Sequence, residues 1–145
     1  MIPAHTRKER RAYNKLRRFD NARDDCTFCI MTTDNPQFVR EGEHFRVIRN
    51  RTPYSFWDGQ GVVDHLMIVP KQHTDRLGKL SPEAAVEYMS IIEEHESKGY
   101  NVYARAPGSS AKSVVHQHTH LIKTDGKGHR LLVHVRWPLY ARIRL

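Results

Sequence analysis

Three histidines alternate with two polar residues at positions 116–120, in the order His-Gln-His-Thr-His. Side chains alternate between the faces of a β-strand, so a strand would place all three imidazoles on one face, about 7 Å apart in succession. A helix would turn each imidazole about 200° away from the one before and scatter them. Apolar pairs on both sides, Val114-Val115 and Leu121-Ile122, also favour a strand. We therefore predict a strand over Ser113–Ile122 that presents three imidazoles to a metal, a phosphate or both.

The clearest predicted helix begins after Ser81. Serine is a favoured N-cap residue, and Pro82 suits the first helical position. An apolar stripe follows at helical spacing and is expected to face the core, with Tyr88 and Ile91 alongside it. The stripe consists of Val86, Met89 and Ile92. Gly99 is expected to end the helix.

Short apolar or β-branched runs around this helix predict strands. Besides the histidine segment they are Phe45–Asn50, Val62–Val69, Tyr100–Ala104 and Leu131–Val135. Segments rich in Gly, Pro and Ser are expected to be loops or turns, at 51–61, 105–112 and 125–128. This order of elements predicts an α+β fold, an antiparallel sheet of about five strands with one long helix packed on it.

The overall composition is typical of one globular domain. The chain has 145 residues, of which 39% are hydrophobic and 28% are charged. It contains no apolar run of about 18 residues, so no membrane span is expected. The first five residues, Met-Ile-Pro-Ala-His, do not resemble a secretory signal. We therefore expect a cytoplasmic protein that does not bind membranes.

Positive charge is concentrated at the start of the chain. The net charge is +8, and residues 1–23 contain eight Lys and Arg against Glu9 and Asp20, which leaves +6. We predict that residues 1–23 form a basic N-terminal arm or helix and that residues 24–145 form the domain. Such an arm could bind nucleic acid or another anionic surface. The alternative is a solvated helix or tail that aids solubility or contacts between subunits.

The two cysteines are separated by two residues, as Cys26-Thr-Phe-Cys29. In a cytosolic chain this spacing suggests metal or redox chemistry rather than a structural disulfide. A zinc site needs about four ligands, and His73 and His116 would complete a Cys2His2 set from remote parts of the fold. The alternatives are two buried cysteines or a redox pair.

Two stretches of the chain resemble the histidine triad (HIT) superfamily. That family has Gly-His-x-Leu-h-h-Pro-Lys-x-His, a long helix, a loop of small residues and then Ser-Val-x-His-h-His-h-His-h-h, where h is apolar. Here Asp64–His73 reads Asp-His-Leu-Met-Ile-Val-Pro-Lys-Gln-His, and Ser113–Ile122 reads Ser-Val-Val-His-Gln-His-Thr-His-Leu-Ile. The likeness extends from about Cys26 to Ile122 and implies a HIT-like fold.

The resemblance also implies nucleotide chemistry at a phosphorus atom. The middle histidine, His118, would attack the α-phosphate of a nucleotide conjugate, such as a dinucleoside polyphosphate or a nucleoside phosphoramidate. It would form a nucleotidyl-histidine intermediate. His120 would hold the phosphate oxygens or the leaving group, and Ser113 would bond the phosphate. In the zinc-containing branch a structural zinc ion has four protein ligands, which correspond to Cys26, Cys29, His73 and His116.

The sequence specifies the acceptor of the nucleotidyl group and the oligomeric state of the protein less closely. We expect a nucleotidyl hydrolase, and the alternative within the superfamily is a nucleotidyltransferase or phosphorylase. A nucleotide- or nucleic-acid-binding module that uses the basic arm is the alternative from another class. The family usually pairs two subunits, so a homodimer is expected.

The segment Val47–Pro53 resembles the nucleoside pocket of the dinucleoside-polyphosphate hydrolase branch. Asn50 would bond a ribose hydroxyl, and Ile48 would lie against the base. The alternative is an ordinary strand end followed by a turn.

Several residues depart from the family pattern. Lys112 stands where glutamine is common, and Arg105 stands where many members have asparagine. Both could contact a phosphate, or both could be exposed cations that face water. Gln117 and Thr119 occupy positions that are usually apolar, and Asp64 replaces a glycine.

Overall fold

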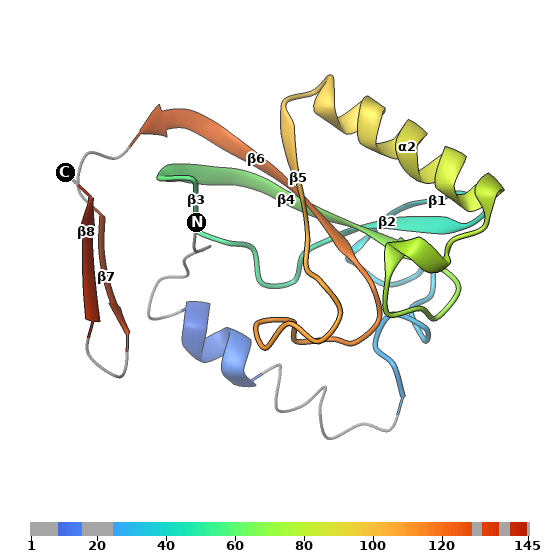
Figure 1. Cartoon of the computed structure of the whole chain (residues 1–145), viewed down its shortest axis with the longest axis horizontal. Coiled ribbons are helices and arrows are strands. Elements are labelled where there is room, and N and C mark those ends of the chain that lie inside the picture. Colours follow the sequence, from blue (N-terminus) through green and yellow to red (C-terminus); the bar gives the residue numbers. More distant parts are fainter. Residues whose placement is uncertain (1–8, 16–24, 129–131, 137–139, 145) are drawn as a thin grey trace.

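The structure is a computed structural model that describes residues 9–15, 25–128, 132–136 and 140–144 (Figure 1). The strands are β1 (Phe38–Glu41), β2 (Phe45–Arg49), β3 (Phe56–Trp57), β4 (Gln60–Pro70), β5 (Tyr100–Ala104), β6 (Thr119–Gly128), β7 (Leu132–Arg136) and β8 (Tyr140–Arg144). The helices are the 3-10 helix η1 (Leu77–Lys79), the α-helix α2 (Pro82–Glu96) and a helical segment at 9–15.

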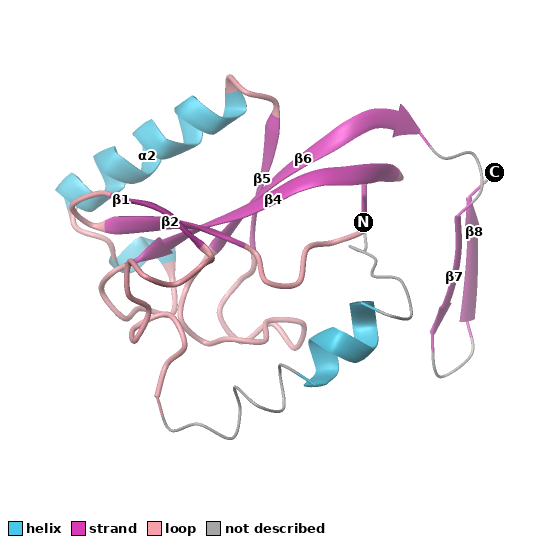
Figure 2. Ribbon diagram, turned by 180° about the vertical axis from the view of Figure 1, so that it is seen from behind, coloured by secondary structure: helices cyan, strands magenta, loops and turns pink. Residues whose placement is uncertain are grey.

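One antiparallel sheet organises the fold. Its strands run in the order β1-β2-β4-β6-β5, and β3 pairs with β4 beside this path. The helix α2 covers one face of the sheet, as Figures 1 and 2 show from opposite sides. β7 and β8 pair in a separate two-stranded sheet. The predicted α+β architecture is confirmed, with six strands in the main sheet rather than about five. The main-sheet strands that were not predicted, β1 and β3, are only 4 and 2 residues long, too short for a clear alternation. The predicted strand Leu131–Val135 corresponds to β7, which pairs with the unpredicted β8 and does not join the main sheet.

The helix α2 begins as predicted but buries a different stripe. The Ser81 side chain accepts a hydrogen bond from the Ala84 amide at 3.2 Å, and Pro82 occupies the first turn. The buried residues are Ala84, Tyr88, Ile91, Ile92 and His95. Val86 and Met89 are exposed by 72% and 59%, so their prediction as core residues was wrong. The error arose because Tyr88 and His95, which combine polar atoms with large rings, supply much of the buried face.

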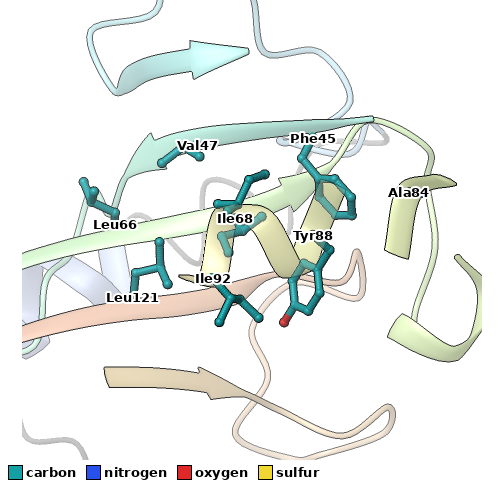
Figure 3. Close-up of a cluster of buried hydrophobic side chains, with 9 residues drawn as sticks. Phe45, Val47, Leu66, Ile68, Ala84, Tyr88, Ile92 and Leu121 are labelled. Atoms are coloured by element: carbon teal, nitrogen blue, oxygen red, sulfur yellow. The ribbon is translucent and has the colours of Figure 1, made fainter. Parts of the chain in front are cut away.

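The core between α2 and the sheet takes alternate residues from three strands. Figure 3 shows Phe45 and Val47 of β2, Leu66 and Ile68 of β4, and Leu121 of β6 around Ala84, Tyr88 and Ile92 of the helix. Because side chains alternate along a strand, the residues between them point to the other face of the sheet. That opposite face holds a second apolar cluster of Ile48, Met67 and Val69 with Phe28 and Met31, and it also holds the histidines.

The predicted histidine strand is wrong at both ends. β6 begins only at Thr119, so His116 and His118 precede it and only His120 of the three lies in a strand. The Gln117 amide donates to the Thr74 carbonyl at 2.6 Å rather than to a neighbouring strand, which keeps the preceding segment off the ladder. β6 then continues through the predicted turn at 125–128, because a shift in register toward β4 and a Gly126 φ of +70° carry it past the Asp-Gly pair.

The predicted loop at 51–61 contains a tight hairpin. β3 pairs with the start of β4, and Trp57 lies opposite Gln60. The two residues between them, Asp58 and Gly59, have φ values of 57° and 81°, as a two-residue hairpin turn requires. Asp-Gly is a favoured pair for this turn, which was the available clue in the sequence.

The helical segment at 9–15 lies within the predicted basic arm, and the rest of residues 1–23 lies outside the described residues. The Glu9 carboxylate accepts a hydrogen bond from the Ser55 hydroxyl, which joins this segment to the loop before β3. The proposed division at residue 24 stays a prediction. Among the described residues no helix is both long and apolar enough to cross a bilayer.

Candidate active site and metal centre

Two cysteines and two histidines converge from distant parts of the chain. They are Cys26, Cys29, His73 and His116, and their ligand atoms all lie within 4.8 Å of one another. The His116 Nδ1 is 3.3 Å from the Cys26 Sγ and 3.5 Å from the Cys29 Sγ. The Cys29 Sγ is 3.2 Å from the His73 Nδ1. In a tetrahedral zinc site of this composition neighbouring ligand atoms are about 3.3–3.8 Å apart, so these residues fit a zinc ion.

A second contact of His116 selects the ring nitrogen that faces the sulfurs. Its Nε2 lies 2.9 Å from the Pro70 carbonyl oxygen. A carbonyl can only accept, so Nε2 carries the proton and Nδ1 keeps the lone pair that a metal ligand needs. His116 is buried, and that burial lowers its pKa to about 4. The ring is therefore neutral at pH 7, as metal binding requires.

The protonation of the Cys29 thiol couples metal binding to pH. Burial of the sulfur and the neighbouring Cys26 raise the pKa of the Cys29 thiol. Without metal, Cys29 therefore favours its neutral thiol, whereas a zinc ion binds the thiolate and displaces the proton.

His118 is held by the backbone of the candidate metal ligand. Its Nδ1 donates to the His116 carbonyl oxygen at 2.9 Å, and its ring packs edge-on against Phe28 with centroids 5.4 Å apart. Burial lowers the pKa of His118, which keeps the ring neutral. Since Nδ1 carries the proton, Nε2 has the lone pair. The result is an oriented, unprotonated nitrogen that can act as a nucleophile.

The proton on His120 is assigned by a chain of contacts that starts at a backbone amide. The Tyr54 amide donates to the His65 Nδ1 at 3.1 Å, so the other nitrogen of His65 carries its proton. That Nε2 lies 2.9 Å from the His120 Nδ1 and donates to it. Burial lowers the pKa of His120 well below the usual range, so the ring is neutral and its remaining Nε2 bears a proton. His118 and His120 therefore present a lone pair and a donor, with ring centroids 5.0 Å apart.

Asn50 and Ile48, the residues expected in a nucleoside pocket, lie beside this chain of contacts. The Asn50 side-chain oxygen accepts from the Thr52 amide at 2.9 Å. Its amide nitrogen is 3.1 and 3.4 Å from the two ring nitrogens of His65, so it lies over the ring face. Ile48 is 0% exposed. A base could therefore touch Ile48 only after the side chains that cover it, such as Phe28, have moved.

Lys112 and Gln117, two departures from the family pattern, contact each other. The Lys112 Nζ donates to the Gln117 Oε1 at 2.7 Å and to the Asp75 carbonyl at 3.1 Å. Gln117 is only 2% exposed, so this bond satisfies a buried acceptor. One N–H of the Lys112 ammonium remains beyond these two bonds. Lys112 thus ties its loop to the segment after β4 and to the residue between His116 and His118.

Two further departures, Thr119 and Asp64, lie on the helix side of the sheet. The Thr119 hydroxyl is 2.8 Å from the Tyr88 hydroxyl of α2, and both side chains are buried. The Asp64 carboxylate accepts from the Tyr100 hydroxyl, and burial together with this contact raises the pKa of Tyr100 to about 12. Both polar substitutions are thus hydrogen-bonded within the fold and do not face the histidines.

Sequence reasoning missed a row of aromatic rings that continues from His120. The row comprises Tyr54, Tyr103 and Trp57, and the Arg105 guanidinium lies 5.1 Å from the Tyr103 ring centroid. Tyr54 and Tyr103 lie 5.5 and 5.9 Å from His120 by ring centroid. From the sequence, Trp57 was expected either to cover a base or to anchor its loop, and its contact with Tyr103 was not predicted. Ser113, the predicted phosphate ligand, is half-buried just after Lys112.

Comparisons with known proteins agree with this geometry. The HIT domain family model matches residues 33–127. Protein hit of Bacillus subtilis is 29% identical over 116 residues, which cover 72% of this chain and 74% of that protein. A HIT family hydrolase from Clostridium thermocellum superposes with a TM-score of 0.54 at 21% identity, over 77% of this chain and 100% of that one. A Zn-bound histidine triad family protein from Mycobacterium smegmatis superposes with a TM-score of 0.51 at 25% identity, over 71% of this chain and 78% of that one. The chain belongs to the HIT domain family.

Proposed function

We propose that this protein is a nucleotide hydrolase that cleaves nucleotide conjugates at the α-phosphate through a nucleotidyl-histidine intermediate. One observation carries the proposal, the 2.9 Å bond from the His118 Nδ1 to the His116 carbonyl. It leaves the His118 Nε2 unprotonated and fixed in direction. Family membership and the hydrolase title of the Clostridium thermocellum relative support the same activity.

In the first step the His118 Nε2 lone pair attacks the α-phosphorus. A nitrogen–phosphorus bond forms, and the bond from phosphorus to the leaving group breaks, with its electron pair going to the leaving group. A phosphate leaving group departs as an anion and needs no proton. The nitrogen of a phosphoramidate first takes a proton from solvent and then leaves as ammonia. The His120 Nε2–H donates a hydrogen bond to the oxygens on which charge develops, an electrostatic role.

In the second step a water oxygen attacks the same phosphorus. The nitrogen–phosphorus bond breaks and its electron pair returns to the His118 Nε2, which restores the neutral ring. One water proton stays on the product and the other goes to solvent. Throughout both steps the His116 carbonyl holds the Nδ1 proton, so the positive charge on the intermediate ring faces an acceptor.

The other predicted residues would bind substrate around these two histidines. Ser113, Arg105 and the remaining N–H of Lys112 would contact the phosphates. Asn50 and Ile48 would contact the ribose and the base, once the side chains over them have moved.

Cys26, Cys29, His73 and His116 would hold a structural zinc ion. Four protein ligands leave no open position, so the ion would supply rigidity rather than Lewis acidity. Because His116 also accepts from His118, that rigidity would extend to the nucleophile. The Zn-bound relative supports this assignment.

The test is a screen of diadenosine polyphosphates, nucleoside phosphoramidates and nucleotide sugars, with and without inorganic phosphate. Samples quenched in alkaline denaturant, which preserves the acid-labile nitrogen–phosphorus bond, should carry the nucleotidyl mass on the peptide that contains His118. His118→Ala should lower turnover roughly 1,000-fold or more and keep the fold and the metal content. His44→Ala, a histidine outside the site, is the matched control. Normal turnover by His118→Ala would refute the mechanism, and a requirement for phosphate would identify a phosphorylase or transferase instead.

Nucleic-acid binding by the basic arm is a second candidate function. Arg10, Arg11 and Lys15 are exposed on the segment 9–15, whereas Tyr13 is half-buried. Exposed cations on one short helix can contact phosphates. We expect salt-dependent binding of an oligonucleotide that is lost when residues 1–20 are deleted. Equal binding by the shortened chain would exclude this function.

We also propose a homodimer. β5 is one of the two terminal strands of the main sheet among the described strands, and a sheet edge can pair with a second copy. Light scattering should give twice the chain mass. A monomeric mass at every concentration tested would contradict this.

A further inference from the structure

We infer that Trp57, Tyr103 and Arg105 form a subsite that takes a leaving group combining an aromatic base with a polyphosphate. The inference rests on the proposed function and makes it more specific, because it separates dinucleoside polyphosphates from conjugates with a small leaving group. Nothing in the HIT pattern of the sequence includes Trp57.

The three residues adjoin the reaction centre. Tyr103 is the β-ladder partner of His120, and its ring stacks beside the imidazole, with centroids 5.9 Å apart and planes 25° apart. Trp57 lies 5.0 Å from the Tyr103 ring by centroid. Tyr54 completes the row, nearly parallel to Trp57 and 5.5 Å from His120. A group that leaves phosphorus next to His120 therefore meets aromatic faces first.

Trp57 reaches this position through the hairpin. β3 pairs only with β4 among the described strands, and Tyr103 belongs to β5, which pairs with β6. The two rings therefore meet across the histidine face of the sheet and not as neighbours on one ladder. The Asp58-Gly59 turn fixes where β3 ends and so where the indole lies. Trp57 and Tyr103 are both half-buried.

Arg105 supplies a positive charge that matches the phosphates of such a leaving group. Its guanidinium lies 5.1 Å from the Tyr103 ring centroid and the side chain is half-buried. Arginine has five N–H donors in a planar fork that suits phosphate oxygens, and aromatic faces stack on nucleobases of any sequence. A polyphosphate followed by a base presents these two features in that order.

The geometry of the displacement indicates that the subsite binds the leaving group rather than the retained nucleoside. In-line displacement expels the leaving group on the side opposite the attacking nitrogen. His118 contacts Phe28 and His120, and the aromatic row continues from His120. His120 is the residue proposed to donate to the oxygens on which charge develops, so a departing group held by His120 lies beside the aromatic row.

The experiment compares two substrates that share one adenylyl group. Diadenosine tetraphosphate expels an aromatic polyanion, whereas adenosine 5′-phosphoramidate expels ammonia. We expect Trp57→Leu and Arg105→Gln each to lower the ratio of kcat/KM for the first substrate to that for the second by roughly tenfold. Trp57→Phe, which keeps an aromatic ring, and Phe56→Leu, which alters the same hairpin at the next residue, should leave the ratio within about threefold.

An unchanged ratio in both Trp57→Leu and Arg105→Gln would overturn the inference, even if both rates fell, since equal losses mean that the aromatic row only supports the fold. A changed ratio in Phe56→Leu of the same size would also overturn it. If the unaltered protein cleaves neither substrate and no nucleotidyl adduct forms, the proposed function fails, and this outcome is recognised before any variant is measured.

Discussion

The Nδ1 atom of His118 lies 2.9 Å from the carbonyl oxygen of His116, while the side chain of His116 lies among two cysteines and a third histidine. One residue thus faces the candidate metal with its ring and the candidate nucleophile with its backbone. A change in the position of His116 must therefore change the direction of the His118 lone pair.

Replacing one cysteine should reveal the link between the metal site and the orientation of His118. We expect Cys29→Ser to weaken zinc binding at least about tenfold and to lower the melting temperature, because structural zinc contributes directly to folding. Turnover should fall as well, although Cys29 touches no substrate. Metal analysis and calorimetry measure the first two effects. His44→Asn is the control and should keep its zinc, and full zinc content in Cys29→Ser would mean that the four residues are not the ligand set.

The hydrogen bond between Lys112 and Gln117 should give a measurable coupling energy in a double-mutant cycle. Lys112→Met leaves a buried amide oxygen without its charged donor, at a cost of about 1.5–3 kcal/mol in unfolding free energy. Replacing both residues, with Gln117→Leu as the second change, should recover part of that cost and give a coupling of about 1–2 kcal/mol. Urea unfolding of the four proteins measures it. The exposed Lys98–Glu94 pair is the comparison and should couple by less than about 1 kcal/mol. Additive losses at Lys112 and Gln117 would contradict the contact.

Two apolar residues of α2 should respond oppositely to truncation. Ile92 is 8% exposed and Met89 is 59% exposed. Ile92→Ala should cost about 2–5 kcal/mol of unfolding free energy, because it leaves a cavity against the sheet. Met89→Ala should cost less than about 0.5 kcal/mol, since its side chain is mostly in water. Chemical denaturation measures both. Similar losses at the two positions would mean that the helix is rotated from the orientation described here.

Acid should destabilise the protein through its buried histidines. The pKa of His120 is lowered well below its usual range by burial, whereas the unfolded chain titrates near 6.5. Below about pH 6.5 the unfolded state binds a proton that the folded state does not, so the unfolding free energy falls as pH falls. The loss is at most about 1.4 kcal/mol per pH unit for each such group, and it ends below the folded-state pKa.

The variant His120→Asn should flatten this dependence when unfolding is compared at about pH 7 and about pH 5.5. The same metal concentration in all samples keeps ligand protonation in the zinc cluster from contributing to the difference. An identical pH dependence with and without His120 would show that the ring is protonated in the folded state.

Local sequence features predicted the elements that they control. Ser81 and Pro82 located the start of α2 because capping depends on neighbouring residues alone. β5 was predicted with its observed bounds, and β2 and β4 within two residues, since each is rich in β-branched or aromatic residues. The buried face of α2 was predicted only in part. Ile92 is buried as expected, but Tyr88 and His95 become core residues only when Thr119 and the Ile91 carbonyl supply partners for their polar atoms.

The candidate site was likewise predicted where it depends on local spacing and missed where it depends on the fold. The cysteine pair and the three histidines were recognisable because their spacing is local, and the fold brings His73 to the cluster as expected. The contact between Lys112 and Gln117 was not predicted, because it depends on how the loop 105–112 turns back toward Asp75. The contact between Trp57 and Tyr103 depends on the reach of a two-residue hairpin that the sequence only hinted at.

The antiparallel pairing of β4 with β6 has a consequence for how this chain can evolve. Met67 faces His120 and Ile68 faces Thr119 across the ladder, so adjacent residues serve the chemical face and the helix core in turn. Losing or gaining one residue within β6 would exchange the two sets and send an imidazole into the core. Related sequences should therefore keep a constant number of residues here and place their insertions and deletions in segments such as 51–55 and 105–112, which lie off the ladder.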